Sequence, residues 1–432
     1  MSNFFKFVLI FIFLLSCSLD SKSGFWSKPQ KIKKENEIVI KKLFEEDKSL
    51  DNEFNKNVKI KLNSQTSVNN LKKNLSNNSG IINYDGELKS ISRYKFSKID
   101  NFYRFEPEIV FDKKNLIFFD NKGSILKFDT NTKLVWKKNF YSKSEKKLKP
   151  MIALAINENY LIVADNLAKY YAINVKTGDL LWMKNNIAPF NSQIKIYKNH
   201  IFVIDFQNVL RCYSIVDGKE LWNIRTDNSF VKSQKKLSLI IYKDKVFFNN
   251  NLGDISAVDI NKGKLIWQTP TQDSSIYESS FHLKTSDLIL ANNSIYFSNN
   301  NNEFYSLDIK TGTLIWKQKV NSSIRPTSVE NLVFTVSENG FLITVEADTG
   351  NIVRITDVFD KINEKKRDKI RPVGFVLGKE QIYLTTSNGR LIVIDILTGK
   401  SNQIIKIDNE TISKPFILDK NLFIIKNNAV IK

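Results

Sequence analysis

The sequence predicts an all-β fold, an eight-bladed β-propeller of four-stranded antiparallel blades whose ring is closed by an N-terminal strand. One template of apolar strands and polar turns recurs from about residue 106 to the end of the chain. The turn in each copy, at positions 133, 178, 218, 263, 312, 350 and 399, returns after 38 to 49 residues. That period holds four short strands, which make one propeller blade. Five of the six tryptophans occupy the same place in the template.

Each copy of the template contains a tight turn followed by a strand that usually carries Trp. The clearest copy is Ala172-Ile-Asn-Val-Lys-Thr-Gly-Asp-Leu-Leu-Trp182. The first copy has Lys133 in place of Gly, and the last two keep the turn but lack Trp. Gly supplies the positive φ that the turn needs, and an Asp side chain can accept backbone hydrogen bonds there. The predicted turn glycines are Gly178, Gly218, Gly263, Gly312, Gly350 and Gly399.

The repeated tryptophans are expected to lie flat between neighbouring blades. That position buries a large aromatic surface and gives the indole N–H a hydrogen-bond partner in the next blade. We interpret these tryptophans and the turn glycines as structural parts of the repeat, not as a catalytic set. The tryptophans are Trp136, Trp182, Trp222, Trp267 and Trp316.

The last copy of the template stops before its outermost strand. Its apolar segments are 415–417, 422–425 and 429–431. The alternating segment Leu88 to Phe96 precedes the first complete blade, and we expect it to supply the missing strand. Such closure removes strand edges that would otherwise favour aggregation. The propeller is therefore predicted to span residues 88–432.

Residues 1–16 are predicted to be a lipoprotein signal peptide. The apolar run that follows Lys6 is too short to span a bilayer but suits a signal-peptide core. It ends in Leu-Leu-Ser-Cys17, which is similar to the lipobox of bacterial lipoproteins, so Cys17 is predicted to be acylated. An ordinary signal peptide with Cys17 near its end is the alternative. Residues 17–87 contain few periodic apolar positions and are predicted to form a flexible tether.

The composition offers little for catalysis or metal binding. Only two histidines, His200 and His282, and two cysteines, Cys17 and Cys212, are present. These are too few for a multi-histidine metal site, a Cys-based metal site or a disulfide framework. The net charge of +20 could attract nucleic acid, but the lysines are scattered along the chain. We predict no enzymatic activity, no cofactor, no metal and no nucleic-acid partner, and we place Cys212 in the core.

The repeat core, Ala-x-Asp-x-x-Thr-Gly-x-x-x-Trp, resembles the repeat of the quinoprotein family. Enzymes of that family hold pyrroloquinoline quinone over a calcium ion in an eight-bladed propeller. The resemblance covers about residues 88–432. The adjacent cysteine pair and the Cys-x-x-Cys-His haem motif known from those enzymes are absent from this sequence. A degenerate quinone-dependent dehydrogenase is one alternative function.

The signal, the lipobox, the repeat number and the lack of redox residues resemble the BamB family, non-catalytic lipoproteins of the outer-membrane β-barrel assembly (BAM) complex. The resemblance implies a lipid anchor in the outer membrane, with the protein facing the periplasm. Ser18, the residue after the cysteine, permits transfer to the outer membrane. It implies BamA and other BAM components as partners, with nascent outer-membrane proteins as further candidates. A scaffold of some other envelope complex is a further alternative.

The resemblance to the BamB family also implies partner-binding residues. In that family one side of the propeller binds a periplasmic domain of BamA, partly through a Leu-x-Leu-Arg stretch just after a Trp strand of the third blade. The corresponding stretch here is Trp222-Asn-Ile-Arg225. The resemblance therefore implies that Arg225 contacts BamA through charge-assisted hydrogen bonds and that Ile224 contacts it as an apolar anchor. The alternative for both residues is an ordinary strand at the edge of a blade.

Overall fold

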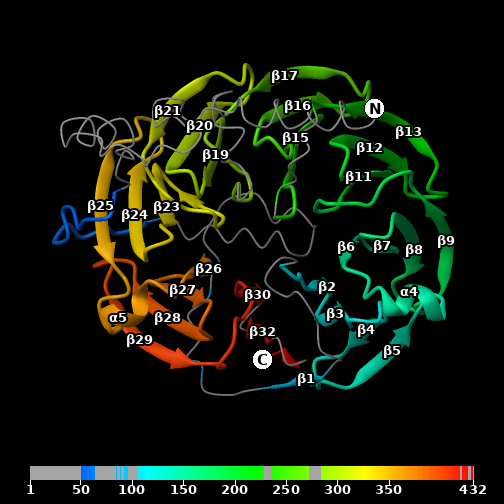
Figure 1. Cartoon of the computed structure of the whole chain (residues 1–432), viewed down its shortest axis with the longest axis horizontal. Helices are drawn as coiled ribbons and strands as arrows, with labels where there is room; N and C mark the ends of the chain where they lie inside the picture. The colour runs from blue at the N-terminus through cyan, green and yellow to red at the C-terminus, as the bar shows by residue number, and fades with distance from the viewer. Residues whose placement is uncertain are drawn as a thin grey trace, which may run out of the picture. The chain divides into compact units, whose positions relative to one another are not determined.

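The four-stranded sheets predicted from the repeat are present in the computed structural model of the chain. The structure describes residues 50–63, 84, 88, 92–95, 106–227, 233, 235–271, 284–418, 421–426 and 430–431. All of them belong to one compact unit, Ser49–Lys432. Within this unit the sheets follow one another around a ring (Figure 1). The predicted all-β propeller class is confirmed.

Seven blades in the described part of the chain are antiparallel sheets in which four consecutive strands pair in chain order. The first blade is β2 (Val110–Asp112), β3 (Asn115–Phe119), β4 (Ile125–Phe128) and β5 (Leu134–Lys138). The second is β6 (Ile152–Ile156), β7 (Tyr160–Asp165), β8 (Lys169–Asn174) and β9 (Leu180–Asn185), and the third is β10 (Lys195–Tyr197), β11 (His200–Ile204), β12 (Val209–Ser214) and β13 (Glu220–Arg225).

The next four blades repeat this order. They are β14 (Leu239–Tyr242), β15 (Lys245–Asn249), β16 (Ile255–Asp259) and β17 (Leu265–Thr269); β18 (Ile289–Ala291), β19 (Ser294–Asn299), β20 (Glu303–Asp308) and β21 (Leu314–Gln318); β22 (Thr327–Val329), β23 (Leu332–Val336), β24 (Phe341–Glu346) and β25 (Ile352–Asp357); and β26 (Pro372–Leu377), β27 (Gln381–Thr386), β28 (Arg390–Asp395) and β29 (Ser401–Lys406).

The eighth blade joins two distant parts of the chain. Its C-terminal strands are β30 (Phe416–Leu418), β31 (Asn421–Phe423), β32 (Ile425–Lys426) and β33 (Val430–Ile431). β31 pairs with β30 and β32 pairs with β33, and a single residue separates β31 from β32 along the chain. The outermost strand is β1 (Tyr94–Lys95), which pairs antiparallel with β33. β1 lies inside the predicted donor segment, so closure of the ring by an N-terminal strand is confirmed.

Two short helices in the described part of the chain connect blades. α4 (Lys143–Lys147) follows the first blade, and its N-cap Ser142 forms a capping box with Glu145. α5 (Glu364–Arg367) follows the sixth blade. No helix within the described residues combines the length and the hydropathy that crossing a membrane requires.

The core lies between the blades, because adjacent sheets pack face to face. One cluster joins Ala155 and Ile162 of the second blade to Ile201 and Tyr213 of the third, and similar clusters join other neighbouring blades. The inner strands are therefore buried on both faces and read as continuous apolar runs. The outermost strands alternate between exposed and partly buried residues, as the pattern of β13 shows.

The outer strand of each of the seven chain-order blades carries a register shift beside the repeat position of Trp. In the second blade Ala172 lies opposite Trp182, whereas Ile173 lies opposite Leu180, so Leu181 is an extra residue. This β-bulge leaves Leu180 and Leu181 41% and 47% exposed. Other blades expose the same apolar pair, which is Leu134 and Val135, Leu265 and Ile266, or Leu314 and Ile315.

Residues 50–63, which we call the strap, bind the sixth and seventh blades. Phe54 and Ile355 exchange both backbone hydrogen bonds, at 2.9 and 3.1 Å, on the side of β25 that faces away from β24. Ile60 is 5% exposed and joins the core cluster of these two blades. The predicted flexible tether, 17–87, is therefore wrong for the strap. A few apolar side chains suffice to hold an irregular segment against a blade, although they produce no period in the sequence.

Further hydrogen bonds fix the strap along its length. The Leu50 N–H donates to the Lys319 carbonyl at 3.1 Å, and the Ile60 N–H donates to the Leu397 carbonyl at 2.9 Å. Beyond the strap, Tyr84 of the predicted tether is also buried and packs edge-on against Tyr383.

Candidate functional site

The predicted partner-binding residues lie on β13, the outermost strand of the third blade. β13 pairs with β12 on one side, and no described residue pairs with its other edge. Arg225 is exposed, and its guanidinium donates one long hydrogen bond of 3.5 Å to Gln207. Ile224 is half-buried and packs against the cluster between the third and fourth blades. The two side chains point to opposite faces of the strand, so the structure does not bring them onto one surface.

The repeat tryptophans lie between blades. Each donates its indole N–H to a backbone carbonyl of the next blade at 2.8–3.3 Å, where it ties two sheets together. The acceptors of Trp136, Trp182, Trp222, Trp267 and Trp316 are the carbonyls of Val175, Ile215, Ile260, Ile309 and Ala347.

The turn glycines meet these tryptophans face to face. The six predicted turn glycines all have positive φ, between 61° and 76°. A Cβ atom at Gly263 would lie 2.6 Å from the Trp222 ring, closer than real Cβ atoms approach other atoms. The turn thus needs Gly for its φ and also for the close approach of the neighbouring indole.

Arg354 takes the place of Trp in the sixth blade, which the sequence pattern did not reveal as a contact residue. The side chain is fully buried and lies against Gly399, as Trp does against Gly elsewhere. Its guanidinium donates to the carbonyls of Ile396 and Leu397 in the seventh blade, at 2.9 and 2.7 Å. It also donates to the Val58 carbonyl of the strap at 3.0 Å. Burial lowers the pKa of Arg354 to about 10, so it remains charged at neutral pH.

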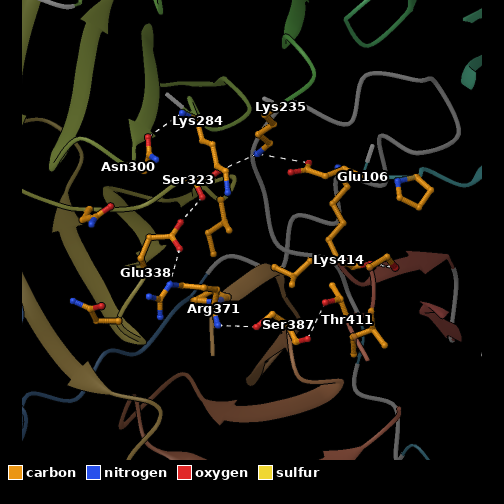
Figure 2. A pocket seen from close by; sticks show the side chains of 18 residues that line it. Glu106, Lys235, Lys284, Asn300, Ser323, Glu338, Arg371, Ser387, Thr411 and Lys414 are labelled. Carbon is orange, nitrogen blue, oxygen red and sulfur yellow. Dashed lines mark hydrogen bonds and ion pairs between the residues drawn. The ribbon is translucent and has the colours of Figure 1, made fainter. Parts of the chain in front are cut away.

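A polar cavity of 370 Å³, which we call the inner cavity, lies among the loops beside the innermost strands (Figure 2). Its charged lining consists of four cations and two carboxylates, and hydroxyl and amide side chains complete it. The lining residues are Glu106, Pro107, Lys235, Lys284, Asn300, Asn321, Ser323, Ile324, Glu338, Asn339, Arg371, Pro372, Val373, Ser387, Thr411, Ile412, Ser413 and Lys414.

At one position of the repeat, several blades carry a charged residue on the inner side of the ring. It is the residue two places before the innermost strand, which is Glu108 before β2, Asp287 before β18, Arg325 before β22 and Lys414 before β30. The innermost strands of different blades converge, so these residues interact although they are far apart in sequence (Figure 1). A charged residue just before an apolar strand was the sequence signal that could have revealed them.

Ion pairs hold the charged groups around the inner cavity. The Lys414 ammonium lies 2.8 Å from Glu108 and 3.6 Å from Asp287. On the cavity wall Lys235 lies 3.7 Å from Glu106, as a dashed line in Figure 2 marks. Burial works to raise the pKa of Asp287, but the cations Lys414 and Lys235 hold it well below its usual range. Burial likewise works to lower the pKa of Lys414, but Glu108 and Asp287 raise it.

Lys195 of β10 is a deeply buried cation near this network. Its side chain is 2% exposed, and its ammonium forms no ion pair with any residue that the structure describes. Burial lowers the pKa of Lys195 to about 8, although the more distant Glu108 and Asp287 act to raise it. Burial of the charged amine therefore opposes folding at neutral pH.

We expect Lys195→Met to stabilise the protein at neutral pH, by up to about 3 kcal/mol. The folded-state pKa is lowered, so the cost of the buried charge is fully present below pH 8. It declines as the pH rises from 8 towards 10.5, where the unfolded chain binds more protons than the folded one. Urea unfolding of both proteins at pH 7, 8, 9 and 10 measures the difference between their free energies of unfolding. A difference that stays constant with pH would contradict the prediction.

The cysteines and histidines occupy separate places. Cys212 of β12 is a buried free thiol, as expected, and burial raises its pKa to about 12. His200 begins β11 and is half-buried. Cys17 and His282 lie outside the described residues. No group of three His, Cys, Asp or Glu side chains in the described part of the chain is placed to hold a metal ion.

One family model matches the part of the chain that contains most of these sheets. The family model of the outer membrane protein assembly factor BamB matches residues 121–356, which is more than half of the chain. The chain belongs to this family. The BamB match begins just before β4 of the first blade and ends in β25 of the sixth, so it includes β13 and the strand that the strap covers.

Solved structures share the fold of this BamB-family chain. BamB from Moraxella catarrhalis is 14% identical, with a TM-score of 0.64 over 79% of this chain and 98% of that one. Quinohemoprotein alcohol dehydrogenase from Comamonas testosteroni is 11% identical, with a TM-score of 0.56 over 84% and 74%. A europium-containing methanol dehydrogenase is 12% identical, with a TM-score of 0.56 over 73% and 81%. No curated protein sequence matches the chain.

Proposed function

We propose that the chain is a non-catalytic lipoprotein scaffold of the outer-membrane β-barrel assembly complex. In this proposal Cys17 anchors it in the outer membrane, and the propeller faces the periplasm and binds BamA. The observation that carries the proposal is the BamB family match over residues 121–356. The described repeat supports a binding role, since its Trp side chains and Arg354 hold neighbouring blades together and its turn glycines make room for them.

The outer edge of β13 is the proposed contact with BamA. Its edge is unpaired among the described residues, and Arg225 stands exposed beside it. A strand edge of this kind can bind a partner through backbone hydrogen bonds, with side chains adding specificity. The strap supports this use of a blade edge, because Phe54 already pairs in that way with the outer strand of the sixth blade.

We expect Arg225→Glu to reduce the recovery of BamA at least tenfold in an affinity purification. The experiment uses the tagged full-length lipoprotein and detergent-solubilised envelopes. Charge reversal removes the charge-assisted hydrogen bonds that we assign to the guanidinium and leaves an unpaired carboxylate at the contact. Because Arg225 is exposed, the substitution should leave folding intact.

Lys319→Glu is the matched control for this experiment. Lys319 is exposed and stands three residues after Trp316, as Arg225 stands three residues after Trp222. It should co-purify BamA as the unmodified protein does. Equal recovery with both variants would reject the β13 contact, whereas recovery of a different envelope complex by the unmodified protein would reject the assembly role itself.

Cys17→Ala is expected to move the protein from the membrane pellet to the soluble fraction after cell lysis. Each buried methylene of an acyl chain contributes about 0.8 kcal/mol, so the loss of all acyl chains removes the anchor. Ultracentrifugation and immunoblotting measure the distribution. Cys212→Ala serves as the control, since a buried core thiol has no part in anchoring. Sedimentation of Cys17→Ala with the membranes would contradict the anchor.

A further inference from the structure

The inner cavity contains more positive than negative charge. Four cations line it, Lys235, Lys284, Arg371 and Lys414, against the two carboxylates of Glu106 and Glu338. Glu108 and Asp287, the other described partners of Lys414, are not part of the lining. The described wall of the cavity therefore carries two more positive charges than negative ones.

Three of the four cations, Lys235, Lys284 and Arg371, have no described carboxylate at hydrogen-bond distance, whereas Lys414 is held by Glu108 at 2.8 Å. Lys235 and Glu106 are 3.7 Å apart, and so are Arg371 and Glu338, which is longer than a charge-assisted hydrogen bond. The Lys284 ammonium makes no ion pair with a described residue. Lys235 is nevertheless 7% exposed, so its charge is screened by little water.

The rest of the lining suits a polar ligand. Ser387, Thr411 and Ser413 contribute hydroxyl groups, and Asn300 and Asn321 contribute amides. A volume of 370 Å³ is in the range of small-molecule sites. Excess cations around such a space favour a compact ligand with several negative charges, because a buried cation is stabilised by an opposite charge within about 4–6 Å.

We propose that the inner cavity binds a small multivalent anion that carries carboxylate or phosphate groups. This site is separate from the β13 edge, and it goes beyond the scaffold role. Lys235 and Arg371 contact the anion from opposite walls of the cavity, as their positions in Figure 2 illustrate. Glu338 opposes binding through its negative charge.

Isothermal titration of the purified full-length protein with pyrophosphate and with citrate, at 0.15 M sodium chloride, tests the proposal. We expect at least one of them to bind with a dissociation constant below about 1 mM and to raise the thermal unfolding midpoint. Pyrophosphate and citrate separate a phosphate from a carboxylate preference. Glycerol, a small neutral molecule that carries hydroxyl groups but no charge, should give neither heat nor a midpoint shift.

Removing a cation and removing a carboxylate should change the affinity in opposite directions, which damage to the fold would not do. Lys235→Gln and Arg371→Gln should each weaken binding about tenfold, whereas Glu338→Gln should strengthen it severalfold. Lys219→Gln, at an exposed lysine on the turn before β13, should leave the affinity within twofold.

The absence of binding by both anions would overturn the proposal. So would a loss in Lys219→Gln equal to that in Lys235→Gln, since binding would then be non-specific attraction to a basic surface. Neither result bears on BamA binding.

Discussion

Trp316→Ala is expected to lower the free energy of unfolding by about 3–5 kcal/mol. The indole is 7% exposed and packs against Tyr296 and Phe304 of its own blade. It also donates a 2.8 Å hydrogen bond to the Ala347 carbonyl of the next blade. The substitution therefore opens a cavity and removes the shorter of two hydrogen bonds to the Ala347 carbonyl, which keeps the one from the Tyr296 hydroxyl at 3.2 Å. Urea unfolding followed by fluorescence and circular dichroism measures the loss.

Two further variants separate the causes of this effect. Trp316→Phe keeps most of the aromatic volume and should cost roughly a third as much, since it mainly removes the hydrogen bond. Ile315→Ala, at the neighbouring residue, removes a side chain that is 45% exposed and should cost less than about 1 kcal/mol. If Ile315→Ala were as damaging as Trp316→Ala, the indole would not be the link between the blades.

Arg354→Ala is expected to destabilise the protein by about 3 kcal/mol or more and to release the strap. The substitution removes a donor to three carbonyl oxygens, those of Ile396, Leu397 and Val58. The Leu397 carbonyl keeps the Ile60 N–H as a donor, but the buried Ile396 carbonyl loses its donor at a cost of about 1–3 kcal/mol. Truncation of the buried side chain adds the cost of a cavity. Since Val58 belongs to the strap, its loss of anchoring should expose residues 50–63 to protease while the propeller is still folded. Limited proteolysis with mass spectrometry detects the new cleavage sites.

Arg354→Trp tests whether the strap depends on the arginine itself. This variant restores the residue of the other blades, which can stack on Gly399 and offer one N–H to the seventh blade. We expect it to recover part of the stability that Arg354→Ala loses, yet to leave the strap cleavable. Full protection of residues 50–63 in Arg354→Trp would show that Phe54 and Ile60 hold the strap without the guanidinium.

The fold could be predicted because the same pattern of strands and turns recurs in blade after blade. The turn of Gly178 and the strand of Trp182 recur at the length of a blade, and the structure explains the pairing, since each indole covers the next turn glycine. The missing strand of the eighth blade was predictable as well, because a ring with an unpaired edge requires a donor. β1 supplies it.

The strap and the inner cavity could not be predicted in the same way. The strap contacts a blade through Phe54 and Ile60 without strand periodicity, so its composition resembles that of an unstructured segment. The charges of the cavity come from loops of different blades, for example Lys235 and Arg371. Their proximity is a property of the closed ring and not of any one stretch of sequence. Ile224 was assigned by resemblance, and its half-buried position depends on packing against the fourth blade.

The pairing of β1 with β33 also determines the order in which the molecule can assemble. Each of the first seven blades consists of consecutive residues and can form its hairpins locally, through contacts of short sequence separation. The eighth blade needs Tyr94 beside Ile431, so it can be completed only after nearly all of the described chain has been synthesised and brought together. Non-local pairing of this kind slows folding because the loop entropy is lost before the contacts form. Ring closure should therefore be the late, rate-limiting step of folding, and a partly exported chain would expose the unclosed edges of its first and latest blades.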